Sequence, residues 1–376
     1  MRTRSFICLD VDLLGHQLQK CLNEGLKPTL AIVFASPKQD LQKLVTIFSD
    51  ADIDLAGCTT AGEIINDEMY ESSIAVMLLE VNRDWYDLEI VDYKTETVYQ
   101  ASFQAGLNIN KHRTHPGLLV LSGGMAIDAE ALIHGLRDGL GRDLPMFGGL
   151  AADELKMEQT FAFSNNFITD KGSVLVIFDT QKIKMEGLAI SGWEAVGGVN
   201  EITRSEGNVV YSINGEPAYD VFIRYFGLSE KSTKSDLLIN IQTNYPFQFQ
   251  RNGKFILRSP LQVDEVAKTI TLAARVEEGA RFRFSNSPGF EVIDQTVREF
   301  AQLKETAPDA DALILFSCKG RHGALGPMLE DEIKSLYDYW KKPMIGFLSY
   351  GEIGDGGDGI CAFHNETCSL VILKEI

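Results

Sequence analysis

The sequence has few cysteines, and none of them forms a pair. The six cysteines of the 376-residue chain are scattered, with no CxxC pair and no spacing that suits a zinc ion. A disulfide framework and a structural metal site are therefore not expected. Isolated thiols of this kind are typical of a reduced, cytoplasmic protein that buries most of them.

The sequence also lacks a long apolar run and an excess of positive charge. No apolar stretch approaches the roughly 20 residues that a membrane span needs, and Asp10 and Asp12 interrupt the apolar N-terminal segment. Acidic residues outnumber basic ones by 53 to 35, a formal net charge of −18. Such a surface repels nucleic-acid phosphates and anionic lipids, so we expect neither nucleic-acid binding nor membrane insertion.

The chain contains three copies of one pattern. Each copy starts with an apolar run that reaches a serine, continues through a helical stretch, and ends in a glycine followed six residues later by a glutamate. The runs are LAIVFAS (30–36), LLVLSGG (118–124) and ALILFSCKG (312–320), and the endings are GCTTAGE (57–63), GGLAADE (148–154) and GFLSYGE (346–352). Another apolar strand follows each glutamate. Strand, helix and strand at this spacing predict βαβ units, and uniformly apolar strands indicate sheets that are covered on both faces.

The middle of the chain has a different pattern. Between residues 182 and 285 short alternating segments are separated by turn sequences such as SEGN (205–208) and INGE (213–216), with a short helix expected over 218–226. We therefore predict an α/β protein with repeated βαβ units in two domains and an additional antiparallel β-rich segment in the middle. The expected domains are residues 1–185 and 186–376.

Ligands of α/β sheets bind beyond the carboxyl ends of the strands. The loop that follows each serine-ending strand and the loop that contains each Gly-x5-Glu sequence should both lie there. The hydroxyls of Thr59 and Thr60, the carboxylates of Glu63 and Glu352 and the guanidinium of Arg321 are candidates there. An acid and a guanidinium in one pocket suit a zwitterion such as an amino acid. The alternative is structural, because such glutamates also brace loops, and Arg321 could form an ion pair with one of the acids.

Two chemical alternatives remain open. His322 or His364 could ligate a haem iron, although a lone histidine is more often an ordinary polar residue. Cys318 or Glu352 could serve a hydrolase or transferase. The chain has no recognisable nucleophile motif and no phosphate-binding loop motif, so we expect a protein that is not an enzyme.

Five motifs together resemble the FIST family. They are GCTTAGEI (57–64), GGLAADE (148–154), FSCKGR (316–321), GFLSYGEIG (346–354) and HNET (364–367), and the resemblance runs from about residue 25 to the C-terminus over both FIST domains. It implies a sensory protein of prokaryotic signal transduction that binds a small ligand such as an amino acid. Some members resemble haem-dependent nitric-oxide sensors.

The resemblance also implies partners and site residues. A histidine kinase, a cyclic-di-nucleotide enzyme or a chemotaxis-type protein would act as a separate output partner. No cofactor is expected, except haem on His364 if the chain is a nitric-oxide sensor. The residues expected to bind the ligand are Thr59, Thr60, Gly62, Glu63, Ser317, Cys318, Arg321, Tyr350, Gly351 and Glu352.

Overall fold

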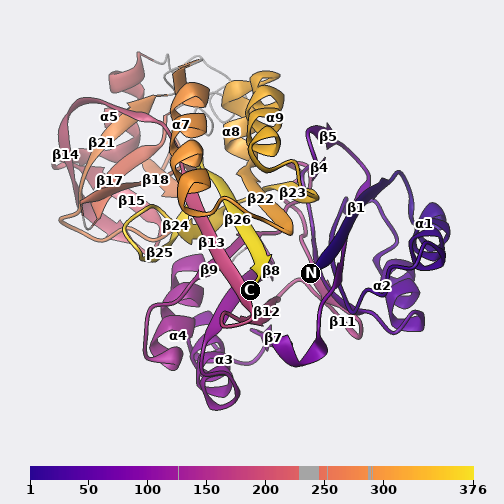
Figure 1. Cartoon of the computed structure of the whole chain (residues 1–376). Coiled ribbons are helices and arrows are strands. Elements are labelled where there is room, and N and C mark those ends of the chain that lie inside the picture. The colour runs from indigo at the N-terminus through magenta and orange to yellow at the C-terminus, as the bar shows by residue number, and fades with distance from the viewer. Residues whose placement is uncertain (126, 228–244, 252, 287–288, 290) are drawn as a thin grey trace.

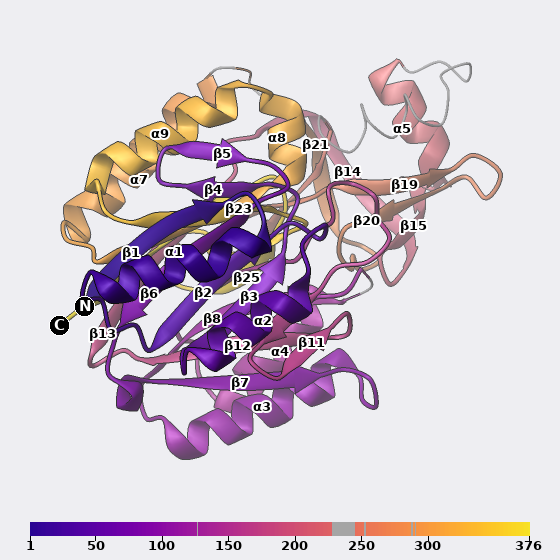
Figure 2. The same cartoon turned by 90° about the vertical axis from the view of Figure 1, so that its right-hand side faces the viewer.

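One arrangement of strands and helices occurs three times along the chain (Figures 1 and 2). The computed structural model describes residues 1–125, 127–227, 245–251, 253–286, 289 and 291–376. The first unit consists of β1 (Arg2–Cys8), α1 (Val11–Asn23), β2 (Leu30–Ala35), α2 (Leu41–Asp50), β3 (Asp54–Thr59), β4 (Glu63–Ile65), β5 (Glu68–Tyr70) and β6 (Ile74–Glu80). A short 3-10 helix, η1 (Arg83–Trp85), leads into the second unit.

The second and third units repeat this order. The second consists of β7 (Tyr86–Asp92), α3 (Val98–His112), β8 (Pro116–Gly123), α4 (Ala129–Leu140), β9 (Met146–Leu150), β10 (Ala162–Ser164), β11 (Phe167–Thr169) and β12 (Gly172–Asp179). The third consists of β13 (Ile183–Ile190), α7 (Glu291–Thr306), β22 (Ala312–Cys318), α8 (Lys319–Leu325), α9 (Met328–Trp340), β23 (Met344–Ser349), β24 (Glu352–Asp355), β25 (Cys361–His364) and β26 (Cys368–Glu375). The repeat read from the sequence is therefore present in all three copies.

Each unit builds the same sheet. In the first, β2 and β3 are parallel, β6 lies antiparallel to β2, and β1 lies antiparallel to β6. The second and third units follow the same scheme around the parallel pairs β8–β9 and β22–β23. Each parallel pair is joined through a helical crossover, which confirms the predicted α/β class with repeated βαβ units.

The units exchange their hairpins in a closed cycle. The hairpin β4–β5 of the first unit extends the sheet of the third unit by pairing with β23. The hairpin β24–β25 of the third unit pairs with β9 of the second, and β10–β11 of the second pairs with β3 of the first. Each of the three sheets that the units build therefore has six strands, two of which come from a neighbouring unit. Unfolding one unit would remove the edge of another, so the three units are expected to unfold together.

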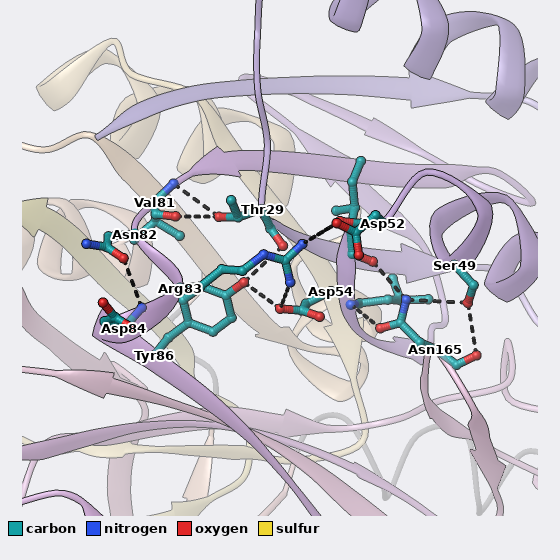
Figure 3. A network of polar contacts seen from close by, with 12 residues as sticks. Thr29, Ser49, Asp52, Asp54, Val81, Asn82, Arg83, Asp84, Tyr86 and Asn165 are labelled. Atoms are coloured by element: carbon teal, nitrogen blue, oxygen red, sulfur yellow. Dashed lines mark hydrogen bonds and ion pairs between the residues drawn. The ribbon is translucent and has the colours of Figure 1, made fainter.

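The turn of one exchanged hairpin is anchored by its own side chain. Asn165, between β10 and β11, accepts a hydrogen bond from Leu55 N at 2.7 Å and donates to the Ile53 carbonyl at 2.8 Å. Figure 3 shows this asparagine at one end of a group of polar contacts. Near the middle of the same view, the carboxylate of Asp54 accepts hydrogen bonds from Arg83 and Tyr86. These contacts fix the register of a second-unit hairpin on a first-unit strand.

Helices cover the outer faces of the sheets, and an apolar core fills the space between them. Asp10, Asp40 and Asp128 cap α1, α2 and α4 by accepting a backbone N–H of the first turn. The rings of Phe34, Phe316 and Phe347 meet in the centre, with 4.6 Å between the centroids of Phe34 and Phe347. Because these rings come from the first and third units, the core is shared between units.

The predicted β-rich segment is an insertion into the third unit, between β13 and α7 (upper left in Figure 1). We call it the insert; it is antiparallel throughout. It consists of β14 (Glu194–Glu206), β15 (Val209–Ile213), β16 (Glu216–Pro217), α5 (Ala218–Phe226), β17 (Phe247–Arg251), β18 (Lys254–Arg258), β19 (Pro260–Asp264), β20 (Thr269–Leu272) and β21 (Arg281–Asn286). Both predicted turns and the short helix are confirmed, while residues 228–244 of the predicted segment lie outside the described part.

The division into two domains at residue 185 stays a prediction, and strand pairing crosses that point. β4 pairs with β23 and β24 pairs with β9, so each side of the boundary completes a sheet on the other side. The chain ends also meet, since the N-terminal amine lies 3.4 Å from Asp311 Oδ2 and also pairs with Glu375. None of the described helices combines the length and the apolar character needed to cross a bilayer.

Candidate functional site

The three Gly-x5-Glu turns meet as the sequence predicts. Ala61 N donates to the Leu348 carbonyl at 3.0 Å, Leu150 N donates to the Gly351 carbonyl at 2.9 Å, and Ala152 N donates to the Thr59 carbonyl at 2.9 Å. Each turn thus contacts the next around the cycle. Most side chains of the turns are buried and fill the centre, while Glu154 lies at the surface.

Two glutamates hold these turns by equivalent hydrogen bonds. Glu63 accepts from Thr60 Oγ1 and from both the backbone N–H and the hydroxyl of Ser73, at 2.9 and 2.6 Å. Glu352 accepts from Ser349 Oγ at 2.5 Å and from the N–H and hydroxyl of Thr367, at 3.4 and 2.7 Å. Both carboxyl groups are fully buried. This is the bracing alternative that the sequence left open.

The third glutamate of the pattern does not have this role. Glu63 and Glu352 each pair with the same position of the neighbouring sheet strand, and the second-unit residue that pairs with this position is Ala162. The shift arises because residues 154–161 form an additional loop before β10. Glu154 lies in that loop and pairs with Lys38 on the surface at 2.7 Å. The position equivalent to Ser73 and Thr367 is Gly172. The second unit therefore has neither the glutamate nor the hydroxyl residue that form the brace in the other two units.

Burial changes the protonation of the brace in the third unit. Removal from water raises the pKa of Glu352 to about 8, against the opposing effect of its hydroxyl partners. The neighbouring Glu366 is also fully buried, and burial raises its pKa to about 8. Burial also raises the pKa of Glu63. The two carboxyl groups of the third unit are thus protonated and neutral in the folded chain at neutral pH.

Arg321 forms an internal ion pair, as one alternative expected, but its partner is Glu332 and not one of the glutamates of the turns. Its guanidinium donates to Glu332 through Nε at 3.0 Å and Nη2 at 2.5 Å, and both side chains are 0% exposed. It also donates to Thr296 Oγ1 at 2.9 Å. The segment after β22, expected as a loop, begins helix α8 at Lys319, and this turn directs Arg321 inward. Two hydrogen bonds in one plane hold the guanidinium in a single orientation.

The other predicted site residues are buried, except Tyr350, which is half-buried. Thr59 accepts from Phe161 N at 3.0 Å, and Tyr350 donates to Asp153 Oδ1 at 2.5 Å. Ser317 is 0% exposed, and Cys318 is buried with its thiol pKa well above the ordinary value because of burial. Gly62 and Gly351 have φ of +141° and +156°, and Leu348 and Phe363 respectively would contact any added Cβ. The ligand-binding role of these ten residues stays a prediction.

An open cleft lies immediately outside this braced centre, between the insert and the third unit. It has a volume of about 460 Å³, within the range of small-molecule sites. We call it the insert cleft. The residues that line it and are used below are Ser191, Trp193, Gln248, Lys254, Phe255, Leu257, Gln295, Glu299, Gln302, His364 and Thr367.

The predicted motif residues form the layer behind this cleft. Thr367 lines the cleft and donates its hydroxyl to Glu352. Arg321 donates through Nη1 to the carbonyl of Ser191, and its guanidinium lies 5.2 Å from the ring centroid of Trp193. Two cleft-lining segments are therefore fixed by Glu352 and Arg321, two residues that the sequence singled out. Sequence reasoning missed most of the lining, because apart from His364 and Thr367 much of it comes from the insert and α7, which carry none of the repeated motifs.

Two polar atoms at the cleft lack partners. The indole N–H of Trp193 and the side-chain carbonyl of Gln248 are buried and hydrogen-bond to no other described residue. The Gln248 amide donates only weakly to the Trp193 carbonyl, at 3.3 Å. Each unsatisfied buried group costs roughly 1–3 kcal/mol. A buried donor and a buried acceptor without partners, both in residues that line the cleft, suit an ordered water or a polar ligand that reaches them.

The histidine considered for haem also lines the cleft. His364 is buried, which lowers its pKa to about 4, so the ring is neutral. Its Nε2 lies 3.2 Å from the Gly354 carbonyl. If Nε2 carries the proton, Nδ1 keeps a lone pair, which is the pattern of a metal-bound imidazole tied to a carbonyl. His322 lies 3.2 Å from Lys319 Nζ instead and does not line the cleft. The described residues contain no cluster of three metal-ligating side chains.

Comparison with known proteins covers most of the chain. Residues 29–216 match the FIST N domain, and residues 218–355 match the FIST C domain. The chain is also similar to uncharacterized protein MJ1623 of Methanocaldococcus jannaschii, with 25% identity over 409 residues that cover 96% of this chain and 77% of that protein. The boundary between the two domain matches falls inside the insert, next to the start of α5.

Proposed function

Because the chain belongs to the FIST family, whose domains are associated with signal-transduction sensing, we propose that it binds a small zwitterion in the insert cleft and signals to a separate output protein. The observation that carries the proposal is the open cleft of about 460 Å³ backed by the motif residues. Its floor holds an unpaired donor and acceptor, from Trp193 and Gln248.

The lining of the cleft suits an amino acid or a related metabolite. Lys254 on β18 and Glu299 on α7 line it from different walls, and neither forms an ion pair with another described residue. An ammonium group can pair with Glu299 while a carboxylate pairs with Lys254. Phe255 and Leu257 add apolar surface for a side chain. As in the sequence analysis, one acidic and one basic side chain would bind a zwitterion, but the two side chains are those of the cleft and not those of the buried turns.

Signalling follows from the two-sided construction of the cleft. One wall belongs to the insert and the other to the third unit, so a ligand that contacts both favours the arrangement in which they are close. A partner that contacts both surfaces can distinguish the two arrangements. We propose that this partner is a histidine kinase, a cyclic-di-nucleotide enzyme or a chemotaxis-type protein, acting in trans, and that the chain itself is not an enzyme.

Thermal-shift measurements with the individual standard amino acids test the proposal. A ligand that binds only the folded chain raises the melting temperature in proportion to the logarithm of its concentration above Kd. We expect a saturable increase with at least one amino acid. If none of them raises the melting temperature at millimolar concentration, zwitterion sensing by this cleft is wrong.

The position of His364 supports a second candidate, a haem-based nitric-oxide sensor. The imidazole would hold the iron through Nδ1, and the bound haem would supply the iron atom that takes up nitric oxide. Reconstitution with haem should then give a Soret band that is lost in His364→Ala and kept in His322→Ala. A chain that retains no haem after desalting would exclude this candidate.

A further inference from the structure

A second pocket lies between the insert and helix α4 of the second unit. It has a volume of about 310 Å³ and is lined by residues of α4, β17, β18 and the segment after β20. We call it the arginine pocket, because Arg251, Arg258 and Arg275 all line it. Three guanidinium groups in one small pocket stand out in a chain with 53 acidic and 35 basic residues.

The carboxylates at this pocket do not neutralise its arginines. Arg251 and Arg258 both donate to the same oxygen, Oε1 of Glu130, with Arg251 Nη1 at 3.2 Å. Arg258 is 1% exposed, so its charge is held away from water. The single carboxylate oxygen that it contacts is shared with Arg251. Arg275 is exposed and forms no ion pair with the other residues that the structure describes. One further acid, Glu277, lines the rim.

His134 on α4 is placed between two of the cations. Arg137 Nη2 lies 3.1 Å from its Nδ1, and Arg251 Nη2 lies 3.4 Å from its Nε2. Burial and the charge of Arg137 lower the pKa of His134, so the ring is neutral at neutral pH and has one lone pair. One ring nitrogen must therefore carry a proton that faces a guanidinium. An anion between these groups would remove this mismatch.

We propose that the arginine pocket binds the phosphate group of a small organic phosphate. A carboxylate presents its two oxygens in one plane, whereas a phosphate presents oxygens around a tetrahedron and carries close to two charges at neutral pH. Guanidinium groups from two strands and a loop suit the second geometry. Phe249, Ile256 and Val276 line the same pocket and give the organic part of the ligand an apolar surface.

This site is distinct from the insert cleft, and a single hairpin separates the two. From Phe255 to Arg258 the side chains of β18 alternate, so Phe255 and Leu257 line the insert cleft while Ile256 and Arg258 line the arginine pocket; Lys254, at the start of the strand, lines the insert cleft. The hairpin β17–β18 is therefore a partition with one pocket on each face. An anion in the arginine pocket also ties the insert to α4, so it would restrict the movement of the insert relative to the second unit.

Calorimetric titration of the full chain with phenyl phosphate and with benzoate, at equal ionic strength, tests the proposal. The two probes share a ring and differ in the anionic group. We expect phenyl phosphate to bind with 1:1 stoichiometry and benzoate to bind at least roughly tenfold more weakly. The variant Arg251→Gln/Arg275→Gln should weaken phenyl phosphate binding by roughly tenfold or more. Arg258 is left in place, so Glu130 keeps a partner and the fold is preserved.

The control is Arg298→Gln, which removes one exposed positive charge from α7 and changes no residue of either pocket. It should bind phenyl phosphate as the unmodified chain does. Absence of phenyl phosphate binding, equal binding of benzoate, or unchanged binding by the double variant would each overturn the proposal. None of these variants alters the insert cleft, so such a failure would leave the proposed function standing.

Discussion

Replacement of Glu352 by glutamine should make the stability of the protein less dependent on pH. Burial raises the pKa of this carboxyl to about 8 in the folded chain, while the exposed unfolded value is near 4.3. Between these values the folded chain holds a proton that the unfolded chain has released. The free energy of unfolding of the natural chain therefore falls as pH rises through this window.

The size of the effect follows from the shift. One extra proton in the folded state lowers the free energy of unfolding by about 1.4 kcal/mol per pH unit, or roughly 4 kcal/mol between pH 5 and pH 8. Glutamine at 352 matches the shape of the protonated acid and can still bond to Ser349 and Thr367. The stability of Glu352→Gln relative to the natural chain should therefore increase by up to this amount across the window. The raised pKa of Glu366 comes mainly from burial, which both proteins share, so most of its contribution cancels in the difference; the smaller part due to the charge of Glu352 is absent from the variant.

Urea unfolding at pH 5, 6, 7 and 8 measures this difference. Glu305→Gln, which replaces an exposed glutamate near the end of α7, is the matched control and should follow the natural chain at every pH. A stability difference between Glu352→Gln and the natural chain that does not change with pH would refute the reasoning. It would mean that the buried carboxyl is ionised in the folded protein.

Three further outcomes are expected. Lys254→Gln should weaken binding of a responsive amino acid by about tenfold in titration calorimetry, because the carboxylate loses its only cationic partner among the described cleft residues. Arg321→Lys should lower the free energy of unfolding by about 3–5 kcal/mol in urea, since lysine cannot supply the planar pair of hydrogen bonds and leaves Glu332 buried and poorly paired. Asp153→Ala should increase limited proteolysis at residues 154–159, because this carboxylate accepts three backbone N–H groups that hold the loop; a cleavage pattern identical to that of the natural chain would contradict this.

The sequence predicted much of the fold because its signals are local. Apolar runs followed by periodic helices predicted all three βαβ units, and two turn sequences predicted the turns on either side of β15 in the insert. The exchange of hairpins between units was not predictable in this way. A hairpin that stays in its own sheet and one that joins a neighbouring sheet have the same local pattern, and only the packing of the whole chain decides between them.

The candidate site was predicted less well, for two physical reasons. Short glycine-and-acid motifs are equally compatible with ligand contact and with bracing, and burial decides between them; Glu63 and Glu352 are both 0% exposed. An insertion before β10 also placed Glu154 out of register, so that Ala162 takes the equivalent position. The lining of the insert cleft comes from glutamines and single charges on α7 and β18, residue types that no sequence pattern distinguishes from an ordinary surface.

Occlusion of the insert cleft tests the central claim most directly. Gln295→Trp places a large side chain at a position of α7 that lines the cleft, and Arg298→Trp places the same side chain at an exposed position of the same helix that does not line it. We predict that, for the amino acid with the largest thermal shift, titration calorimetry shows binding lost in Gln295→Trp and retained in Arg298→Trp. Equal affinity in both variants and the natural chain would show that the ligand binds elsewhere.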